Sequence, residues 1–185
     1  MNIKENLLRM KDLTELMQDL AYSAVFLRDR EIADKVKEMH KEVSMLEEST
    51  LKMLFRVKEP EDERMFIVDL LDSIKDMANA SLHIAELSEG KRPDIIKDIF
   101  RESNEKVITA KISAGSPYAK KTIGENAIRT DTGATIIGIK RKDSWIFNID
   151  KDTKMMPGDE VIAVGTYNGD RTFKKRAQEK KGRKD

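Results

Sequence analysis

The sequence predicts two domains of different fold class: an N-terminal all-α antiparallel helical bundle and a C-terminal α+β domain with the order β-α-β-β-β. Long amphipathic segments fill the first half, where apolar residues recur every three or four positions. Short runs rich in β-branched residues, separated by Gly, Asp and Asn, fill the second half. The apolar period changes at residues 103–107, so we place the bundle in 1–105 and the α+β domain in 106–170.

The composition excludes several classes of protein. The 185 residues include 35 Lys and Arg against 34 Asp and Glu, a balance that does not indicate direct binding to nucleic acid. Cys is absent, which removes disulfides, thiol catalysis and Cys-type zinc sites. No apolar run approaches the roughly 18 residues that a membrane span needs, and no secretory leader opens the chain. We therefore expect a cytoplasmic protein without a membrane span of its own.

Three long helices are predicted for the bundle. The first runs over about 3–27, and the second over about 30–56 with Asp29 as its N-terminal cap. Pro60 ends the second helix because proline disfavours helix in the residue before it. The third spans 66–90 and closes in a glycine, a residue suited to the turn that ends a helix. The short connections predict up-down-up packing.

The third helix carries an apolar row and an opposite polar face. Helical spacing predicts a buried row of Ile67, Leu70, Ile74, Met77, Ser81 and Ile84. The opposite face is predicted to carry Asp69, Asp72, Asp76, Asn79 and His83. The first helix has the same design, because ELMQDLAYSA and DSIKDMANAS align without a gap. Glu15 and Asp19 of the first helix therefore correspond to Asp72 and Asp76 of the third.

The C-terminal domain follows a short connecting helix predicted over about 94–105. A strand over 107–112 comes first, and Ser116-Pro117 has the pattern of a cap and first turn that open a helix. Three further strands are predicted in GATIIGIK, SWIFNI and DEVIAVGTY. One helix cannot cover both faces of such a sheet, so an uncovered apolar face predicts self-association. Residues 171–185 are basic and poor in apolar side chains, which predicts a disordered tail.

Four short motifs mark the C-terminal domain: Ser116-Pro117, Lys121-Thr122-Ile123, Ile139-Lys140-Arg141, and Gly158-Asp159 leading to Gly165. Through these motifs, residues 106–170 resemble the TrkA-C (RCK C-terminal) module of bacterial and archaeal potassium-transport regulators. The resemblance implies a fold that pairs across a two-fold axis and binds a small ligand or a regulatory ion at or near that interface. It thus implies a homodimer through the C-terminal domain, with a nucleotide as one class of ligand.

Cationic side chains gather around the second strand of this domain. Arg129 precedes the strand, and Lys140 and Arg141 end it. Doubled by two-fold symmetry, these charges would attract an anionic ligand. We therefore take Ile128, Arg129, Lys140 and Arg141 as candidate ligand-binding residues. The alternative is that the charges are solvated strand ends, because cationic clusters bind anions only where geometry makes them converge.

The acid-x-x-x-Asp pairs on the first and third helices resemble those of the PhoU family of phosphate-signalling regulators. Residues 3–90 would cover one of its three-helix repeats. Some members of that family hold iron or zinc on this acidic face, which implies Glu15, Asp19, Asp72 and Asp76 as metal ligands. Carboxylates one helical turn apart point the same way and can share a divalent cation. The alternative is an ordinary solvated helix face.

Together the resemblances imply a non-catalytic regulatory protein. In the first hypothesis it senses a small ligand through its C-terminal domain and regulates cation transport, above all of potassium. Its partner would be a membrane cation transporter or channel subunit, which would place the protein at the membrane periphery. In the second it is a metal-binding, phosphate-signalling regulator of the PhoU type. An enzyme is disfavoured, since the sequence has no nucleophile–base pattern, no Gly-rich phosphate loop and no HExxH.

Overall fold

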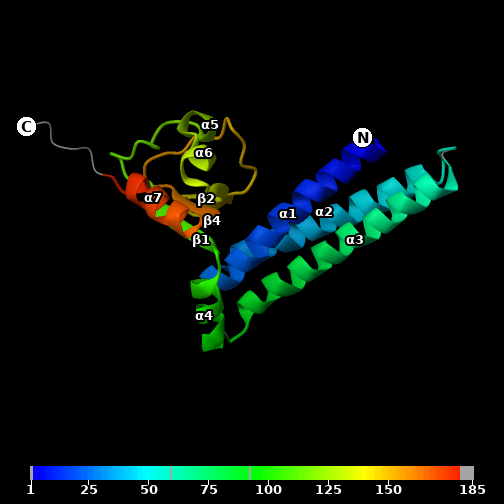
Figure 1. Cartoon of the computed structure of the whole chain (residues 1–185), viewed down its shortest axis with the longest axis horizontal. Coiled ribbons are helices and arrows are strands. Elements are labelled where there is room, and N and C mark those ends of the chain that lie inside the picture. The colour runs from blue at the N-terminus through cyan, green and yellow to red at the C-terminus, as the bar shows by residue number, and fades with distance from the viewer. Residues whose placement is uncertain (1, 59, 92, 180–185) are drawn as a thin grey trace, which may run out of the picture. The chain divides into compact units, whose positions relative to one another are not determined.

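The chain forms two compact units, Met1–Arg92 and Pro93–Asp185, in a computed structural model that describes residues 2–58, 60–91 and 93–179 (Figure 1). The first unit is helical and the second combines a small antiparallel sheet with helices, which confirms the predicted fold classes. Helix α4 (Asp94–Glu102) groups with the second unit, whereas the sequence analysis placed it at the end of the first. Among the described residues, no helix is long and apolar enough to cross a bilayer.

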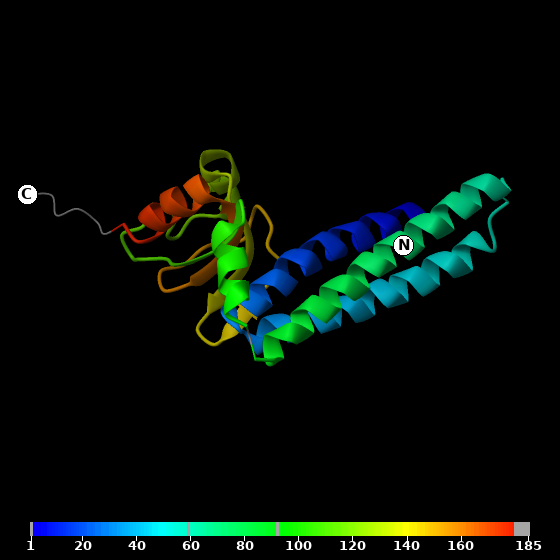
Figure 2. The same cartoon turned by 60° about the horizontal axis from the view of Figure 1, so that its bottom comes forward.

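Three long helices make the first unit: α1 (Ile3–Leu27), α2 (Arg30–Leu54) and α3 (Glu61–Glu86). They lie side by side in both Figure 1 and Figure 2, and each contacts the other two. A short 3₁₀ turn, η1 (Leu87–Glu89), follows α3. The predicted bundle of three helices is therefore present, but the third helix begins five residues before the predicted 66–90 and ends four residues earlier. Gly90 does not close it in a left-handed turn, since its φ is -88 and a 3₁₀ turn intervenes.

Side-chain caps fix where the first two helices begin. The Asn2 side chain accepts a hydrogen bond from the Glu5 N–H at 2.9 Å, and the Glu5 carboxylate accepts one from the Asn2 N–H at 3.0 Å. This reciprocal pair satisfies two N–H groups that a helix start leaves without partners. Asp29 caps α2 as predicted, since its carboxylate accepts from the Glu31 N–H at 2.9 Å.

Helix α3 is rotated relative to the orientation that the sequence predicted. Its buried residues are Leu71, Ile74, Ala78, Ser81 and Ala85, so only Ile74 and Ser81 of the predicted row are buried. Leu70 is 37% exposed and Met77 is 47% exposed. The helix has two adjacent apolar rows, and the bundle buries the row with the smaller side chains. Small residues let neighbouring helices approach closely and fill the space between them.

The second unit is built from four strands and four helices among its described residues. After α4 come β1 (Glu105–Lys111), α5 (Ile123–Asn126), α6 (Ile128–Thr132), β2 (Thr135–Arg141), β3 (Ser144–Ile146), β4 (Glu160–Thr166) and α7 (Tyr167–Ala177). The sheet is antiparallel with the order β1-β4-β2-β3. Strand β4 is central and pairs Ala163 with Ile108 of β1 and with Ile136 of β2. The two outer strands, β1 and β3, each keep one side without a strand partner in the described chain.

Apolar side chains on both faces of the central strands are buried. Ile108, Ile139, Val161 and Ala163 belong to one contiguous core cluster. On the other side, Ile162 is 1% exposed and Ile137 is 3% exposed. The core cluster of the sheet unit lies on the first of these faces. Self-association through an uncovered apolar face stays a prediction, and the open edges of β1 and β3 are a second place at which copies can pair.

The prediction of a disordered tail over 171–185 is wrong for residues 171–177, which lie in α7; residues 180–185 lie outside the described part of the chain. Helix α7 packs against β1, β4 and α6. Phe173 and Ala177 are 0% exposed, and the Phe173 ring stacks on Tyr118 with 5.5 Å between centroids. These two apolar residues are four positions apart and share one helix face. The basic residues at the end of α7 complement the helix dipole.

Ser116-Pro117 forms a turn and does not open a helix as predicted. The Ser116 hydroxyl donates to the Arg176 carbonyl at 2.9 Å and accepts from the Tyr118 N–H at 3.1 Å. The turn is therefore fastened to α7. The next helix, α5, begins only after Thr122, whose side chain and Glu125 form a capping box. The hydrogen bond from the Thr122 backbone lowers the pKa of Glu125.

We predict that Phe173→Ala destabilises the second unit. Truncating a fully buried phenylalanine removes its packing and leaves a cavity, which typically costs about 3–5 kcal/mol. Urea denaturation followed by near-UV circular dichroism measures the loss. Lys175→Ala, an exposed change on the same helix, is the matched control and should be close to neutral. Equal stability of the two variants would mean that α7 is not part of the core.

Candidate functional site

A charged pair joins the end of β2 to the residue before β4, at the end of the sheet where two of the candidate ligand residues, Lys140 and Arg141, lie. Arg141, the last residue of β2, donates from Nε to Asp159 Oδ1 at 2.9 Å and from Nη2 to Asp159 Oδ2 at 2.8 Å. The same Nη2 donates to the Lys154 carbonyl at 2.7 Å. The Asp159 side chain is 2% exposed and that of Arg141 is 38% exposed. This is a two-pronged contact of the kind that guanidinium and carboxylate groups form best.

Asp159 also organises the loop that leads into β4. Its Oδ2 accepts from the Met156 N–H at 2.7 Å, and its carbonyl accepts from the Ile112 N–H at 2.8 Å. The preceding residue, Gly158, has φ +92, a conformation that favours glycine. The Gly158-Asp159 motif is therefore a tight turn. The Asp159 carboxylate holds the loop and the end of β2, and the Asp159 carbonyl holds the residue that follows β1.

The guanidinium of Arg141 is therefore fixed in position by its hydrogen bonds to Asp159 and to the Lys154 carbonyl. The hydrogen bonds from Arg141 to Asp159 raise the pKa of the guanidinium, which remains charged at every pH of interest. Its Nε and Nη2 are engaged with Asp159 and Lys154 and are not free to bind a ligand. A direct ligand contact from this residue remains a prediction. The observed role of Arg141 is to fix the end of β2 against the turn that precedes β4.

Lys140 lies on an aromatic platform on β3. Its Nζ is 5.4 Å from the centre of the Trp145 ring, and Trp145 stacks on Phe147 with 5.6 Å between centroids. Gly138 makes room for this stack, since a Cβ there would lie 3.2 Å from Phe147. A cation over an aromatic face keeps its charge while its position is restricted. Lys140 therefore presents a positioned positive charge beside β3.

The other two candidate residues begin helix α6 and differ in exposure. The Ile128 side chain is 1% exposed and belongs to the core cluster. Arg129 is exposed, and its carbonyl accepts from the Gly133 N–H at 2.8 Å. The structure thus makes Arg129 accessible to a ligand and Ile128 a packing residue that fixes the start of α6. No hydrogen bond that we identify joins Arg129 to Lys140 or Arg141.

The four candidate metal ligands are not brought together as a site. Glu15 pairs with Lys11 at 2.7 Å, and Asp72 and Asp76 are exposed on α3. Within the described ranges, no group of three or more His, Cys, Asp or Glu side chains is arranged to hold a metal ion. A nearby contact that the sequence did not predict joins His40 of α2 to the Asn79 side chain of α3 at 2.8 Å. The only hint of this contact in the sequence is that His40 and Asn79 are polar residues on two helices that were predicted to pack together.

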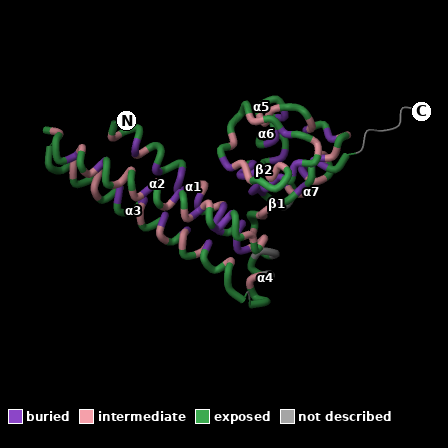
Figure 3. Tube along the Cα trace, turned by 180° about the vertical axis from the view of Figure 1, so that it is seen from behind, coloured by how far each residue is buried: buried purple, intermediate pink, exposed green. Residues whose placement is uncertain are grey.

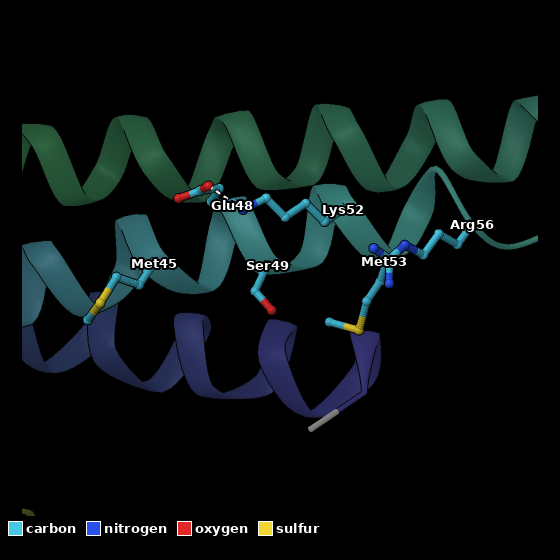
Figure 4. A pocket seen from close by; sticks show the side chains of 6 residues that line it. All are labelled: Met45, Glu48, Ser49, Lys52, Met53 and Arg56. Atoms are coloured by element: carbon cyan, nitrogen blue, oxygen red, sulfur yellow. Dashed lines mark hydrogen bonds and ion pairs between the residues drawn. The ribbon is translucent and has the colours of Figure 1, made fainter.

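A shallow hollow of about 330 Å³ lies on the second half of α2 (Figure 4). Its lining residues come from this end of α2 and the turn that follows it: Met45, Glu48, Ser49, Lys52, Met53 and Arg56. The Lys52 ammonium pairs with the Glu48 carboxylate across one helical turn. None of the candidate ligand or metal residues lines this hollow, so it is a surface feature separate from both predicted sites.

Comparison with protein-family models matches residues 7–90 to the PhoU domain and residues 107–177 to the TrkA-C domain. Both resemblances predicted from the sequence are confirmed: a PhoU-like region is followed by a TrkA-C-like region. The TrkA-C match runs from β1 to the end of α7, so it includes the helix that the sequence analysis treated as a tail. A comparison with curated proteins found no significant match.

Solved structures similar to this chain include RCK_C domains. The RCK_C domain dimer of S. agalactiae BusR in complex with c-di-AMP is 26% identical, with 38% of this chain and 92% of that chain covered and a TM-score of 0.36. The RCK C domain of the potassium transport protein KtrA in complex with cyclic diadenosine monophosphate is 23% identical (44% and 94% covered, TM-score 0.37). BusR of S. agalactiae in complex with its busAB-promoter DNA is 17% identical (94% and 98% covered, TM-score 0.38).

We predict that Arg141→Ala destabilises the second unit because it leaves the Asp159 carboxylate buried without its partner. The expected loss is about 3 kcal/mol, at the lower end for breaking a buried pair because the Arg141 side chain is 38% exposed. Chemical denaturation measures it. Arg171→Ala, an exposed arginine on α7, is the control and should change stability little. Wild-type stability in Arg141→Ala would show that the pair does not hold the loop.

Proposed function

We propose that the chain is a non-catalytic regulatory protein of potassium transport that binds a small anionic ligand through its TrkA-C unit. The observation that carries this proposal is the match of the whole sheet unit, residues 107–177, to the TrkA-C domain in a chain that also carries a PhoU domain. Both are domains of transport regulators, as the sequence resemblances imply. The proposal includes a location in the cytoplasm, at the membrane periphery through the partner.

The geometry of the second unit supports an anion as the ligand. Arg129 is exposed at the start of α6, and Lys140 holds its charge over Trp145. The Arg141–Asp159 pair fixes the end of β2, so Lys140 sits on a rigid strand. Rigid elements position binding groups better than loops do. We therefore retain Arg129 and Lys140 as direct ligand contacts and assign Ile128 and Arg141 to positioning them.

Two partners are proposed. The first is a second copy of this chain, bound through the TrkA-C unit, where the outer strands β1 and β3 leave backbone groups open to pairing. A two-fold dimer would bring the cationic residues of both copies together and raise the local positive potential. The second partner is a membrane cation transporter or channel subunit, which supplies the membrane span that none of the described helices provides.

A metal-binding, phosphate-signalling role of the PhoU type is the second candidate. The PhoU match over residues 7–90 favours it, but the described acidic side chains of one copy form no metal-binding group. Elemental analysis of protein purified without chelator tests it. Stoichiometric iron or zinc that disappears in the double variant Asp72→Ala, Asp76→Ala would support this role. Wild-type protein that contains no metal would argue against the metal-binding role and leave ligand sensing as the proposed function.

We predict that Arg129→Ala and Lys140→Ala each weaken binding of a nucleotide ligand by about tenfold, which corresponds to about 1.4 kcal/mol for one lost charge-assisted contact. Isothermal titration of the full chain with cyclic diadenosine monophosphate, ATP, NAD and mono- and divalent cations measures the affinities. Neither change should lower stability, in contrast to Arg141→Ala.

The control for this titration is Lys151→Ala, an exposed lysine in the loop after β3, which should bind like the wild type. Wild-type protein that binds no nucleotide and no ion in this panel would count against ligand sensing. Wild-type affinity in both Arg129→Ala and Lys140→Ala would instead retain sensing but refute this assignment of the site.

A further inference from the structure

A largely exposed apolar row runs along helix α3 and ends at Leu87, the first residue of η1, next to the row that the bundle buries. We call it the outer α3 row; it consists of Phe66, Leu70, Ser73, Met77, Ala80, Ile84 and Leu87. Phe66 is 68% exposed, Met77 47% and Leu87 67%, although α3 contacts both α1 and α2. Figure 3 shows exposed segments along the whole length of α3. Large apolar side chains gathered on one face of a helix mark an interaction surface.

The spacing of the outer α3 row is that of a helix-packing seam. Successive members are separated by alternating steps of four and three residues from Phe66 to Leu87. This 4-3 alternation keeps a row straight along one side of a helix and suits packing against a second helix. From Phe66 to Leu87 the row is about 32 Å long at 1.5 Å per residue. The partner must therefore present a helix of similar length.

The order of side chains in the row reads nearly the same in both directions. Met77 stands at the centre, with a small residue on each side and two large apolar residues beyond each of these. A two-fold axis through Met77 would set Met77 against its counterpart and Phe66 against Leu87 of the second copy. It would also set Leu70 against Ile84 and Ser73 against Ala80. Large residues at the ends and small ones beside the centre fit the self-complementary surface that a two-fold contact requires.

The charges beside the row favour a protein partner over a lipid surface. Asp69 and Asp76 lie along one edge of the row and are exposed. Amphipathic helices that bind anionic membranes carry Lys and Arg at this edge instead. In the two-fold arrangement Asp69 lies near His83 of the second copy, a compatible pair. Asp76 lies near its own counterpart, so the Asp76 carboxylates repel each other.

We propose that the outer α3 row binds the same row of a second copy of this chain in antiparallel orientation, which pairs two three-helix units. This inference goes beyond the proposed function, which places a dimer contact in the TrkA-C unit. A chain with two self-complementary surfaces on two separate units can close into a dimer held at both units. It can also link copies into larger assemblies.

Cysteine cross-linking tests this contact directly, because the chain contains no Cys. Met77→Cys in the full chain should form a disulfide-linked dimer under mild oxidation, because the two-fold axis places the thiols together. We expect it to form at least about tenfold faster than with Met45→Cys, whose thiol lacks the effective concentration that direct contact gives. Met45 is a matched control since it is also an exposed methionine, 63% exposed on α2.

A second pair of cysteine variants tests whether the two α3 helices pack antiparallel or parallel. Phe66→Cys alone should cross-link poorly, whereas a mixture of Phe66→Cys and Leu87→Cys should give the mixed dimer. Rapid cross-linking of Phe66→Cys with itself would indicate parallel packing and overturn the proposal. Equally slow cross-linking of Met77→Cys and Met45→Cys would also overturn the proposal. The outer α3 row would then be a surface for a different protein. Both changes are at exposed sites, and unchanged thermal melts of the variants would verify the fold.

Repulsion between the Asp76 carboxylates gives a second test without cysteine. Asp76→Asn should strengthen self-association of the full chain, measured by sedimentation equilibrium, while Met77→Glu should weaken it. The nucleotide affinity of Met77→Glu should equal that of the wild type. Titration therefore tests ligand sensing, and sedimentation tests the contact between α3 helices, independently of each other. Weaker association in Asp76→Asn would contradict the two-fold alignment.

Discussion

The buried carboxylate of Asp159 is the constraint on which the sheet unit depends. A carboxylate that is 2% exposed is unstable unless a cation and hydrogen-bond donors surround it. Arg141 supplies the cation and Met156 supplies a backbone donor. Because Arg141 ends β2 and Asp159 precedes β4, satisfying this one charge sets where β2 ends and where β4 begins. Lys140 and the turn after Arg141 are positioned as a result.

A second constraint acts in the helical unit, where close packing decides which apolar row is buried. The row with Ala78, Ser81 and Ala85 faces the core, since its small side chains let α1 and α2 approach. Methionine and leucine side chains at Met77 and Leu70 are then left on the outside. The same choice that completes the three-helix bundle therefore creates the surface that we assign to a second copy. Under the two proposals, each unit offers one surface for a copy of itself.

The sequence predicted much of the fold because its local signals were strong. Asp29 predicted the start of α2 correctly, and the change of period separated the helical half from the sheet. The rotation of α3 was missed because hydrophobicity alone favours Leu70 and Met77 over Ala78 and Ala85, whereas packing favours the small residues. Helix α7 was missed because only Phe173 and Ala177 anchor it among many charges. The pairing of Arg141 with Asp159 spans 18 residues and has no local signal.

Hydrogen exchange of the full chain, with and without each nucleotide of the titration panel, is the measurement that tests the central claim most directly. If the TrkA-C unit receives the ligand as proposed, backbone amides over residues 127–142 should exchange more slowly in its presence, because binding closes α6 and the end of β2 against solvent. Exchange around the hollow on α2 should stay unchanged. Unaltered exchange over residues 127–142 at saturating nucleotide, or protection confined to α2, would contradict the account.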